Sequence, residues 1–319
     1  LAQFGAWEYD ALRDELVVRG LAERTDQGWK FAHGLLVDSL ERRARHQSRR
    51  QTHHRRCGEL LERLYPDRPQ QTAARRADHY IEAGELKQAL DPLWQEVDRA
   101  RKVGDMARTR QILMRQEQLL DTLDVPQSDV RRLENALEMT HTRFMMGDAP
   151  KEVLNVLRDV RARAAAAGFP RLVARSYRWM ARCENRRGHP RQAFEYCRRA
   201  GQVARRNEDD ESLIDALIQR AWFERQFGEL QEADRHLREA RRRGRTRDNP
   251  YRELLARHHL AWVAFGQGDE EGAVEHFQAV LEQSREHGYR QLALQCLNGL
   301  GEVARFRGDA PEARRYYWR

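Results

Sequence analysis

The amino-acid sequence predicts an all-α fold, a solenoid in which antiparallel helical hairpins stack into a right-handed superhelix. Three observations support this fold class. A turn glycine recurs at a constant interval of 40 residues in the C-terminal half. Small residues keep fixed distances from that glycine, and apolar residues recur at steps of three and four, the spacing of one helix face.

Four segments that begin with glycine define the period, among them GELQEADRHL and GDEEGAVEHF. The turn glycines of these segments are Gly188, Gly228, Gly268 and Gly308. A repeat of this length indicates units that each bury their apolar face only against a neighbouring unit. We expect each glycine to permit a left-handed backbone between two helices.

Small side chains flank every turn. Seven residues before the glycine stand Ala181, Ala221, Ala261 and Gly301. Five residues after it stand Ala193, Ala233, Ala273 and Ala313. Such residues let two antiparallel helices approach closely, so we expect them at the contact within each hairpin.

This pattern of small residue, glycine and alanine resembles the tetratricopeptide repeat (TPR), which usually has 34 residues. The resemblance covers the chain from about residue 170 to its end. Six extra residues per repeat imply longer helices or longer loops, such as RRRGRTRDNP at 241–250. Forty-residue versions are similar to the repeats of regulatory ATPases and bacterial transcription activators.

Upstream of these repeats the period is less regular. Gly84, Gly104 and Gly147 mark further turns, and Pro126 and Pro150 interrupt helical patterns. The sequence therefore predicts four segments: a partial winged-helix domain at 1–45, a connecting helix at 46–68, irregular helical repeats at 69–168, and 40-residue repeats at 169–319, the last one truncated.

The first segment is typical of a helix, a turn at Gly20, and two short strands around RTDQGW, the pattern of a winged helix. A run of residues there resembles the region that follows the ATPase core in signal-transduction ATPases with numerous domains (STAND), the class that includes the maltose-regulon activator. The run comprises Val18, Arg19, Gly20, Leu21, Phe31, His33 and Leu40. Gly34 and Glu41 depart from that pattern.

The resemblance implies that the winged helix packs against a nucleotide domain rather than binding DNA. It also implies that His33 senses bound ADP, since an imidazole N–H can donate to a phosphate oxygen. The alternative is a histidine that only caps or packs at the end of a strand.

Composition narrows the function classes. The net charge is +8 and the pI about 9.6, which would suit nucleic acid, but only four residues are lysine and acidic residues are interleaved almost throughout. Such an arginine bias indicates GC-rich codon usage more than selection for phosphate contacts. No apolar run could span a membrane and no signal peptide is present, so we expect a cytoplasmic protein. The missing initiator Met and the end at Arg319 within a helical pattern suggest a fragment of a longer protein.

Catalytic motifs are absent from the sequence. It contains no GxxxxGK[ST] phosphate loop, no HExxH and no GxSxG, and its cysteines and histidines lack metal-ligand spacing. We therefore predict no enzyme activity, no catalytic residue, no metal and no cofactor in this fragment. ATP or ADP would belong to another part of a full-length protein.

The candidate partner-binding residues lie on the first helix of each hairpin, which usually lines the concave face. The helix before Gly188 carries Arg175, Arg178, Arg182 and Arg186 on one face. Trp222 and Trp262 occupy the position of Arg182 in the next repeats, and Phe265 lies one turn beyond Trp262. This surface suits an extended peptide with acidic and apolar side chains. The alternative is a solvated arginine face and tryptophans packed between repeats.

A second candidate is the stretch 42–56, which is rich in arginine and contains no acidic residue. Such a block can bind phosphate backbones. The alternatives are a solvated linker helix or a contact with an absent ATPase core.

Together these features predict the sensor and scaffold arm of a multidomain signal-transduction ATPase or transcription regulator, which binds a protein or peptide on its concave face. Two alternatives stay open. One is a stand-alone TPR adaptor, and the other is a DNA-binding regulator that uses its winged helix.

Overall fold

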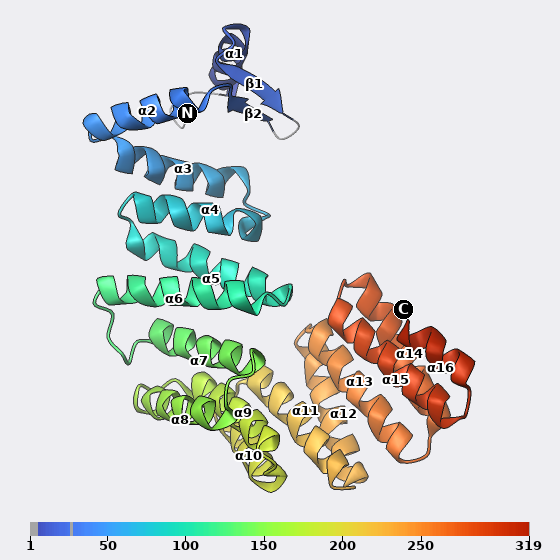
Figure 1. The fold of residues 1–319 in the computed structure, drawn as a ribbon. Coiled ribbons are helices and arrows are strands. Elements are labelled where there is room, and N and C mark those ends of the chain that lie inside the picture. Colours follow the sequence, from blue (N-terminus) through green and yellow to red (C-terminus); the bar gives the residue numbers. More distant parts are fainter. Residues whose placement is uncertain (1–5, 26–27, 319) are drawn as a thin grey trace. The chain divides into compact units, whose positions relative to one another are not determined.

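The structure is a computed structural model that describes residues 6–25 and 28–318. Within these ranges, sixteen helices and two strands follow one another. The chain forms two compact units, of which the first ends at Pro126 and the second begins at Gln127 (Figure 1). The predicted all-α class is therefore confirmed. The unit boundary falls inside the predicted segment 69–168, and the four-segment division stays a prediction.

The first unit begins with a helix and a two-stranded hairpin. The helices of this unit are α1 (Ala6–Val18), α2 (Gly34–His46), α3 (Arg50–Leu64), α4 (Pro69–Glu82), α5 (Leu86–Lys102) and α6 (Met106–Thr122). The strands β1 (Ala22–Thr25) and β2 (Gly28–Phe31) pair antiparallel, with Ala22 opposite Phe31. The helix, the turn at Gly20 (φ 67°) and the hairpin are as predicted, whereas the winged-helix assignment stays a prediction.

The predicted connecting helix belongs to the helical stack. Within 46–68, α3 packs along α4, and Gly58 of α3 lies so close to α4 that an added Cβ would come 2.9 Å from the ring of Tyr80. By contrast, α2 has no buried residue. The segment therefore supplies a first packed layer rather than only a link.

The second unit repeats one helix length. Its helices are α7 (Val130–Met145), α8 (Pro150–Ala166), α9 (Pro170–Arg186), α10 (Pro190–Arg206), α11 (Asp210–Gln226), α12 (Leu230–Thr246), α13 (Pro250–Gly266), α14 (Glu270–Glu286), α15 (Arg290–Phe306) and α16 (Ala310–Tyr317). From α8 to α15 every helix has 17 residues and begins 20 residues after the previous one.

The extra length of the 40-residue repeat lies in the helices. Three residues separate α11 from α12 and again α12 from α13. The segment 241–250, which the sequence suggested as a long loop, lies in α12 up to Thr246. That alternative is wrong, because its arginines and single glycine continue the helix until the turn at 247–249.

The turns share one backbone conformation. Gly188, Gly228, Gly268 and Gly308 have φ between 79° and 84°, as predicted. At the first of these turns the Gly188 N–H donates to the carbonyl of Asn185 (3.0 Å) and the His189 N–H to that of Glu184 (2.9 Å). These two bonds satisfy carbonyls at the end of α9. The alternate turns use Glu208 (φ 56°), Asp248 (φ 48°) and Gly288 (φ 72°) in the same left-handed region.

The small residues lie at the helix contacts, as predicted. The alanines seven residues before and five residues after each glycine are all buried, from Ala181 to Ala313. Gly301 takes the alanine position in the last repeat, where an added Cβ would come 2.5 Å from the ring of Tyr317. A larger side chain would therefore separate the two helices.

Two helical layers result. The odd-numbered helices from α7 to α15 contact one another as well as their even-numbered neighbours, and no comparable contact joins α10, α12 and α14 in the described part of the chain. We call the odd-numbered set the inner layer. The buried side chains between the layers form the core, with Phe223 and Phe277 among the largest that are fully buried. The right-handed sense of the superhelix stays a prediction.

Candidate binding surface on the inner layer

Aromatic and arginine side chains lie together on the inner layer of the second unit. Five of them are half-buried and three are exposed. We call this set the inner row, and its members are Trp179, Arg182, Arg186, Trp222, Arg225, Trp262, Phe265 and Phe306. They come from α9, α11, α13 and α15, so every inner helix from α9 onward contributes at least one member.

At the α9 end, rings and guanidinium groups stack on one another. Trp179 stacks on His141 of α7 with ring centres 4.2 Å apart, and the Arg182 guanidinium lies 4.7 Å from the centre of the Trp179 ring. The Arg186 guanidinium lies 3.8 Å from the centre of the Phe144 ring, and its Nη1 donates to the Phe144 carbonyl (2.9 Å). These contacts hold the arginine side chains against aromatic faces.

The other end of the row is more aromatic. The Arg225 guanidinium lies 5.6 Å from the Trp262 ring centre. Trp262 contacts Phe265 edge to face at 6.2 Å, and Phe265 contacts Phe306 at 5.3 Å. Trp222 packs on the same core cluster as Trp179.

A buried histidine fixes Trp262. The indole Nε1–H donates to Nε2 of His258 (3.2 Å), and Nδ1 of His258 lies 3.6 Å from the Sγ of Cys296. Burial lowers the pKa of His258 to about 4, with a smaller effect from Arg225, so the imidazole is neutral near pH 7. A neutral ring can accept the indole bond, which a doubly protonated ring could not.

Two of the four arginines of the predicted stripe are neutralised by carboxylates of this chain. Arg175 pairs with Glu138 of α7, and Arg178 Nη1 lies 2.6 Å from Oδ2 of Asp215 on α11. Arg252 of α13 binds the other side of the same carboxylate, with Nε 2.9 Å from Oδ1. Burial alone would raise the pKa of Asp215, but the two guanidinium groups outweigh it and hold that pKa below its usual value.

The stripe is therefore not a row of four uncompensated charges. Carboxylates of neighbouring repeats lie opposite Arg175 and Arg178, and Arg186 bonds to a carbonyl. These contacts join successive inner helices, which gives the arginines a structural role. A partner-binding role for Arg175, Arg178 and Arg186 stays a prediction.

Arg182 and Arg225 differ from those arginines. Among the described residues, neither guanidinium has a carboxylate within ion-pair distance, and Nε of Arg225 is buried without a hydrogen-bond partner. The pKa of Arg182 is lowered, first because protein atoms reduce its hydration and then because Arg178 is near. Reduced hydration also lowers the pKa of Arg225.

His33 and the basic stretch lie in the first unit. His33 is the exposed residue that precedes α2 (φ −127°, ψ 129°), and its side chain makes no capping hydrogen bond. In the basic stretch, Arg50 pairs with Glu82 of α4 (2.5 Å), and Arg55 pairs with Glu85, which precedes α5 (3.7 Å). Nucleotide sensing and nucleic-acid binding stay predictions for these residues.

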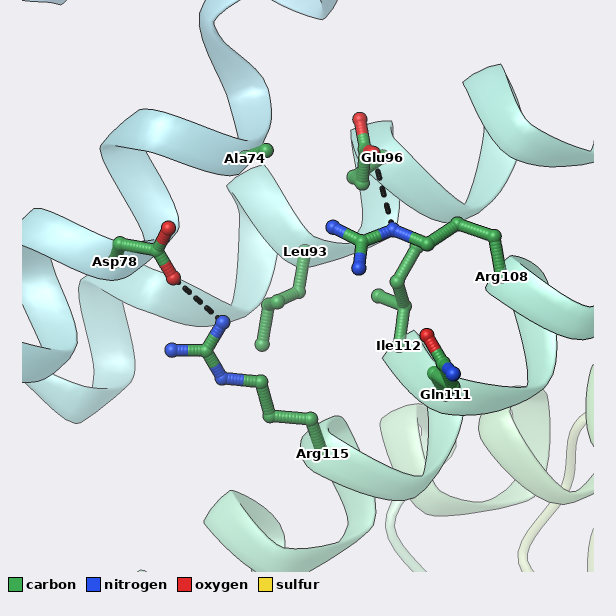
Figure 2. Close-up of a pocket in the computed structure, with 8 residues that line it drawn as sticks. All are labelled: Ala74, Asp78, Leu93, Glu96, Arg108, Gln111, Ile112 and Arg115. Atoms are coloured by element: carbon green, nitrogen blue, oxygen red, sulfur yellow. Dashed lines mark hydrogen bonds and ion pairs between the residues drawn. The ribbon is translucent and has the colours of Figure 1, made fainter.

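A small cavity of about 110 Å³ lies among α4, α5 and α6 (Figure 2). Its two arginines face carboxylates: Arg115 lies 2.6 Å from Asp78 and Arg108 lies 3.7 Å from Glu96. A space of this size holds a few water molecules. Across the described ranges, no cluster of three His, Cys, Asp or Glu side chains could hold a metal, and no helix is long and apolar enough to cross a bilayer.

Sequence reasoning missed several members of this surface. Trp179, Arg225 and Phe306 were not selected, nor were the carboxylates Glu138 and Asp215. Aligning the repeats at 40 residues would have placed Arg225 with Phe265, and Asp215 with Arg175. An acidic residue at the position of a basic one in the previous repeat is the signal for a pair between repeats.

No protein-family model matches the sequence, and no curated protein sequence matches it either. Solved structures do resemble it. The apo form of RapI superposes with a TM-score of 0.64 at 10% identity, covering 84% of this chain and 95% of that one. A Rap protein complexed with competence and sporulation factor gives 0.58 at 14% identity, covering 83% and 72%.

A third solved structure is a STAND protein with a tetratricopeptide repeat sensor from Pyrococcus horikoshii. It gives a TM-score of 0.51 at 12% identity and covers 96% of this chain and 58% of that protein. At these identities the likeness concerns the fold. The chain is a TPR-like helical solenoid.

Proposed function

We propose that this chain is a protein-binding scaffold that holds an extended segment of a partner protein along the inner row. The observation that carries the proposal is the row itself: half-exposed tryptophan and phenylalanine rings with arginines among them, presented by successive inner helices. Aromatic and arginine side chains dominate the energetics of protein interfaces, because they bury large areas and keep a polar edge for orientation.

The shape of the inner layer supports an extended ligand. Axes of packed helices lie about 8–10 Å apart. A segment that crosses them therefore meets the next inner helix about every three residues, since an extended chain rises about 3.3 Å per residue. The partner would then place one side chain in each interval.

Selecting binders from a phage-displayed peptide library against the purified protein tests this function. We expect bound peptides to lose at least about tenfold in affinity for the variants Trp222→Ala and Trp262→Ala, because a buried interface tryptophan typically contributes about 2 kcal/mol or more. Trp318→Ala is the matched control, since Trp318 is exposed and outside the row.

Both tryptophans also pack on core residues, so an alanine variant could lose affinity by unfolding. The affinities of the milder variants Trp222→Phe and Trp262→Phe are therefore measured too, and a thermal melt of each variant checks that it is folded. Peptides that bind the alanine variants with unchanged affinity would place the binding surface elsewhere and contradict the proposal.

A finer proposal is that the scaffold is the sensor arm of a STAND-type regulatory ATPase. It is supported by the fold likeness to the STAND protein, which extends over 96% of this chain, and by the helix and hairpin that precede the repeats. Partner binding on the repeats would then shift the nucleotide domain between closed and open states. The coding sequence upstream of Leu1 tests this proposal: a GxxxxGK[ST] motif supports it, and an upstream stop codon contradicts it.

A further inference from the structure

We propose that the inner row selects an acidic peptide, one that carries two carboxylates about three residues apart, bound by Arg182 and Arg225. The inference rests on the proposed scaffold function and names the class of segment that the scaffold accepts. Two arginines are singled out from the many of this chain by what surrounds their guanidinium groups.

The arginines of the inner helices differ in whether a carboxylate of this chain pairs with them. Arg175, Arg178 and Arg252 each have a carboxylate partner on a neighbouring inner helix. Arg182 and Arg225 have none within ion-pair distance among the described residues, although both lie on inner helices. A guanidinium that packs on an aromatic ring and has no carboxylate partner is a favourable place for an added anion.

Both guanidinium groups are held in place by an aromatic ring. The Arg182 guanidinium lies over Trp179, and the Arg225 guanidinium over Trp262. A guanidinium that rests its face on an aromatic ring can use the N–H groups of its two terminal nitrogens to bind both oxygens of a carboxylate. Holding the side chain in place beforehand also reduces the conformational entropy lost on binding.

The charged groups around Arg182 carry a net positive charge. Asp215 lies between Arg178 and Arg252, and Glu211 pairs with both Arg252 and Arg171, so these three arginines and two carboxylates keep one net positive charge. Arg182 lies beside the group and adds another. The resulting positive potential at the α9–α11 contact favours an anionic ligand and disfavours a basic one.

The spacing of the two carboxylates follows from the helices that carry the two arginines. Arg182 lies on α9 and Arg225 on α11, the adjacent inner helix. Adjacent helix axes are separated by about 8–10 Å. A peptide in the polyproline II conformation covers that distance in about three residues, which is one full turn, so both carboxylates face the same side. Trp222 is one turn from Arg225 on α11, so it is available to an apolar side chain between the two carboxylates.

A peptide series tests the proposal directly. Labelled peptides of the form Asp-(x)n-Asp, with n from 0 to 5 and leucine or tyrosine within the spacer, are titrated against the whole chain by fluorescence anisotropy. We expect the tightest binding at n of about 2, a steep loss of affinity with added NaCl, and no binding when both Asp residues are replaced by Asn.

Variants of the two arginines give the second arm. We expect Arg182→Gln and Arg225→Gln each to weaken binding about tenfold or more, because each removes a charge-assisted contact. Arg182→Lys should recover only part of the affinity, since an ammonium group cannot bind a carboxylate in the same bidentate way. The matched control is Arg235→Gln on the outer helix α12, an exposed arginine paired with Glu232.

The outcomes separate the two proposals. Peptides that bind regardless of charge, or that bind the Arg182→Gln and Arg225→Gln variants with wild-type affinity, overturn the acidic-ligand inference and leave the scaffold function standing. Failure of acidic, neutral and basic peptides alike to bind overturns both. A thermal melt of each variant confirms that a loss of affinity is not a loss of folding.

Discussion

Two regions of the inner layer join their helices in opposite ways. At α9, α11 and α13 the contact is ionic, with Asp215 held between Arg178 and Arg252. At α13 and α15 the contact is apolar: Trp262 and a neutral His258 of α13 pack on Phe277 of the outer helix α14, and His258 lies beside Cys296 of α15. Both regions have the same helix length and the same turns. Equivalent backbone positions can therefore be stabilised by different chemistry.

The difference predicts a separate response to mutation, pH and salt in each region. The ionic region depends on charges that must stay paired. The apolar region depends on a histidine that must stay neutral. Three changes to the chain distinguish the two regions, and the first has the largest expected effect.

Removing the shared carboxylate should be the most damaging change. Asp215→Ala leaves Arg178 without a carboxylate partner in a partly buried site and leaves Arg252 with Glu211 alone, and we expect the free energy of unfolding to fall by about 3–5 kcal/mol. Urea denaturation followed by circular dichroism measures it. Glu232→Ala is the control, because its pair with Arg235 is exposed and should contribute no more than about 1 kcal/mol.

If the two variants lose the same small amount, the ionic contact between inner helices is not a source of stability. In that case the arginines of α9 would be available for other roles.

Mild acid should weaken the apolar region first. The pKa of His258 is about 4 in the folded protein, against 6.5 for an ordinary histidine. Its contribution to stability is therefore complete above pH 6.5 and is lost as the pH falls toward 4, because only the unfolded chain then takes up the proton. The difference between 6.5 and about 4 corresponds to a loss of about 3 kcal/mol.

Unfolding free energies of the wild type and His258→Gln, compared at pH 7.5 and 4.5, measure this effect. The variant should show a smaller drop between the two pH values. The pKa of Asp215 is also lowered, so the stability that its pairs provide is lost only when the pH falls below the usual carboxylate range. An equal drop in both proteins would show that His258 is protonated in the folded state.

Substitutions in the turns should change stability least, and they serve as a control because both regions share the same turn conformation. Gly228→Ala should cost about 1 kcal/mol, because a side chain is strained at φ 81° although no atom lies within 4 Å of the new Cβ. Glu208→Gly, at φ 56°, makes the opposite exchange and should leave stability unchanged or slightly raised. Thermal melts of the two variants measure both changes in stability. A destabilised Glu208→Gly would indicate that the side chain of Glu208, not its backbone conformation, stabilises this turn.

The repeat was predictable because its causes are local. A left-handed turn favours glycine, and a close contact of two helices favours alanine, so Gly188 and Ala181 reveal the fold without knowledge of any partner. The alternate turns were not predictable in this way, because Glu208 and Asp248 take the same conformation without a glycine.

The candidate site was only partly predictable. Aromatic members such as Trp262 follow from the repeat register. The state of each arginine does not, because it depends on whether a carboxylate of the neighbouring helix lies within reach. Arg178 and Arg182 are indistinguishable as sequence on one helix face, yet only Arg178 meets Asp215.

The constant step of 20 residues from α8 to α15 has a consequence for how this chain can change length. Removing 40 consecutive residues, such as 209–248, would join Glu208 to Asn249 and rebuild an equivalent turn with every later helix in its original layer. Removing 20 would instead exchange the inward and outward faces of everything downstream. Natural or engineered variants of this architecture should therefore gain and lose helices in pairs.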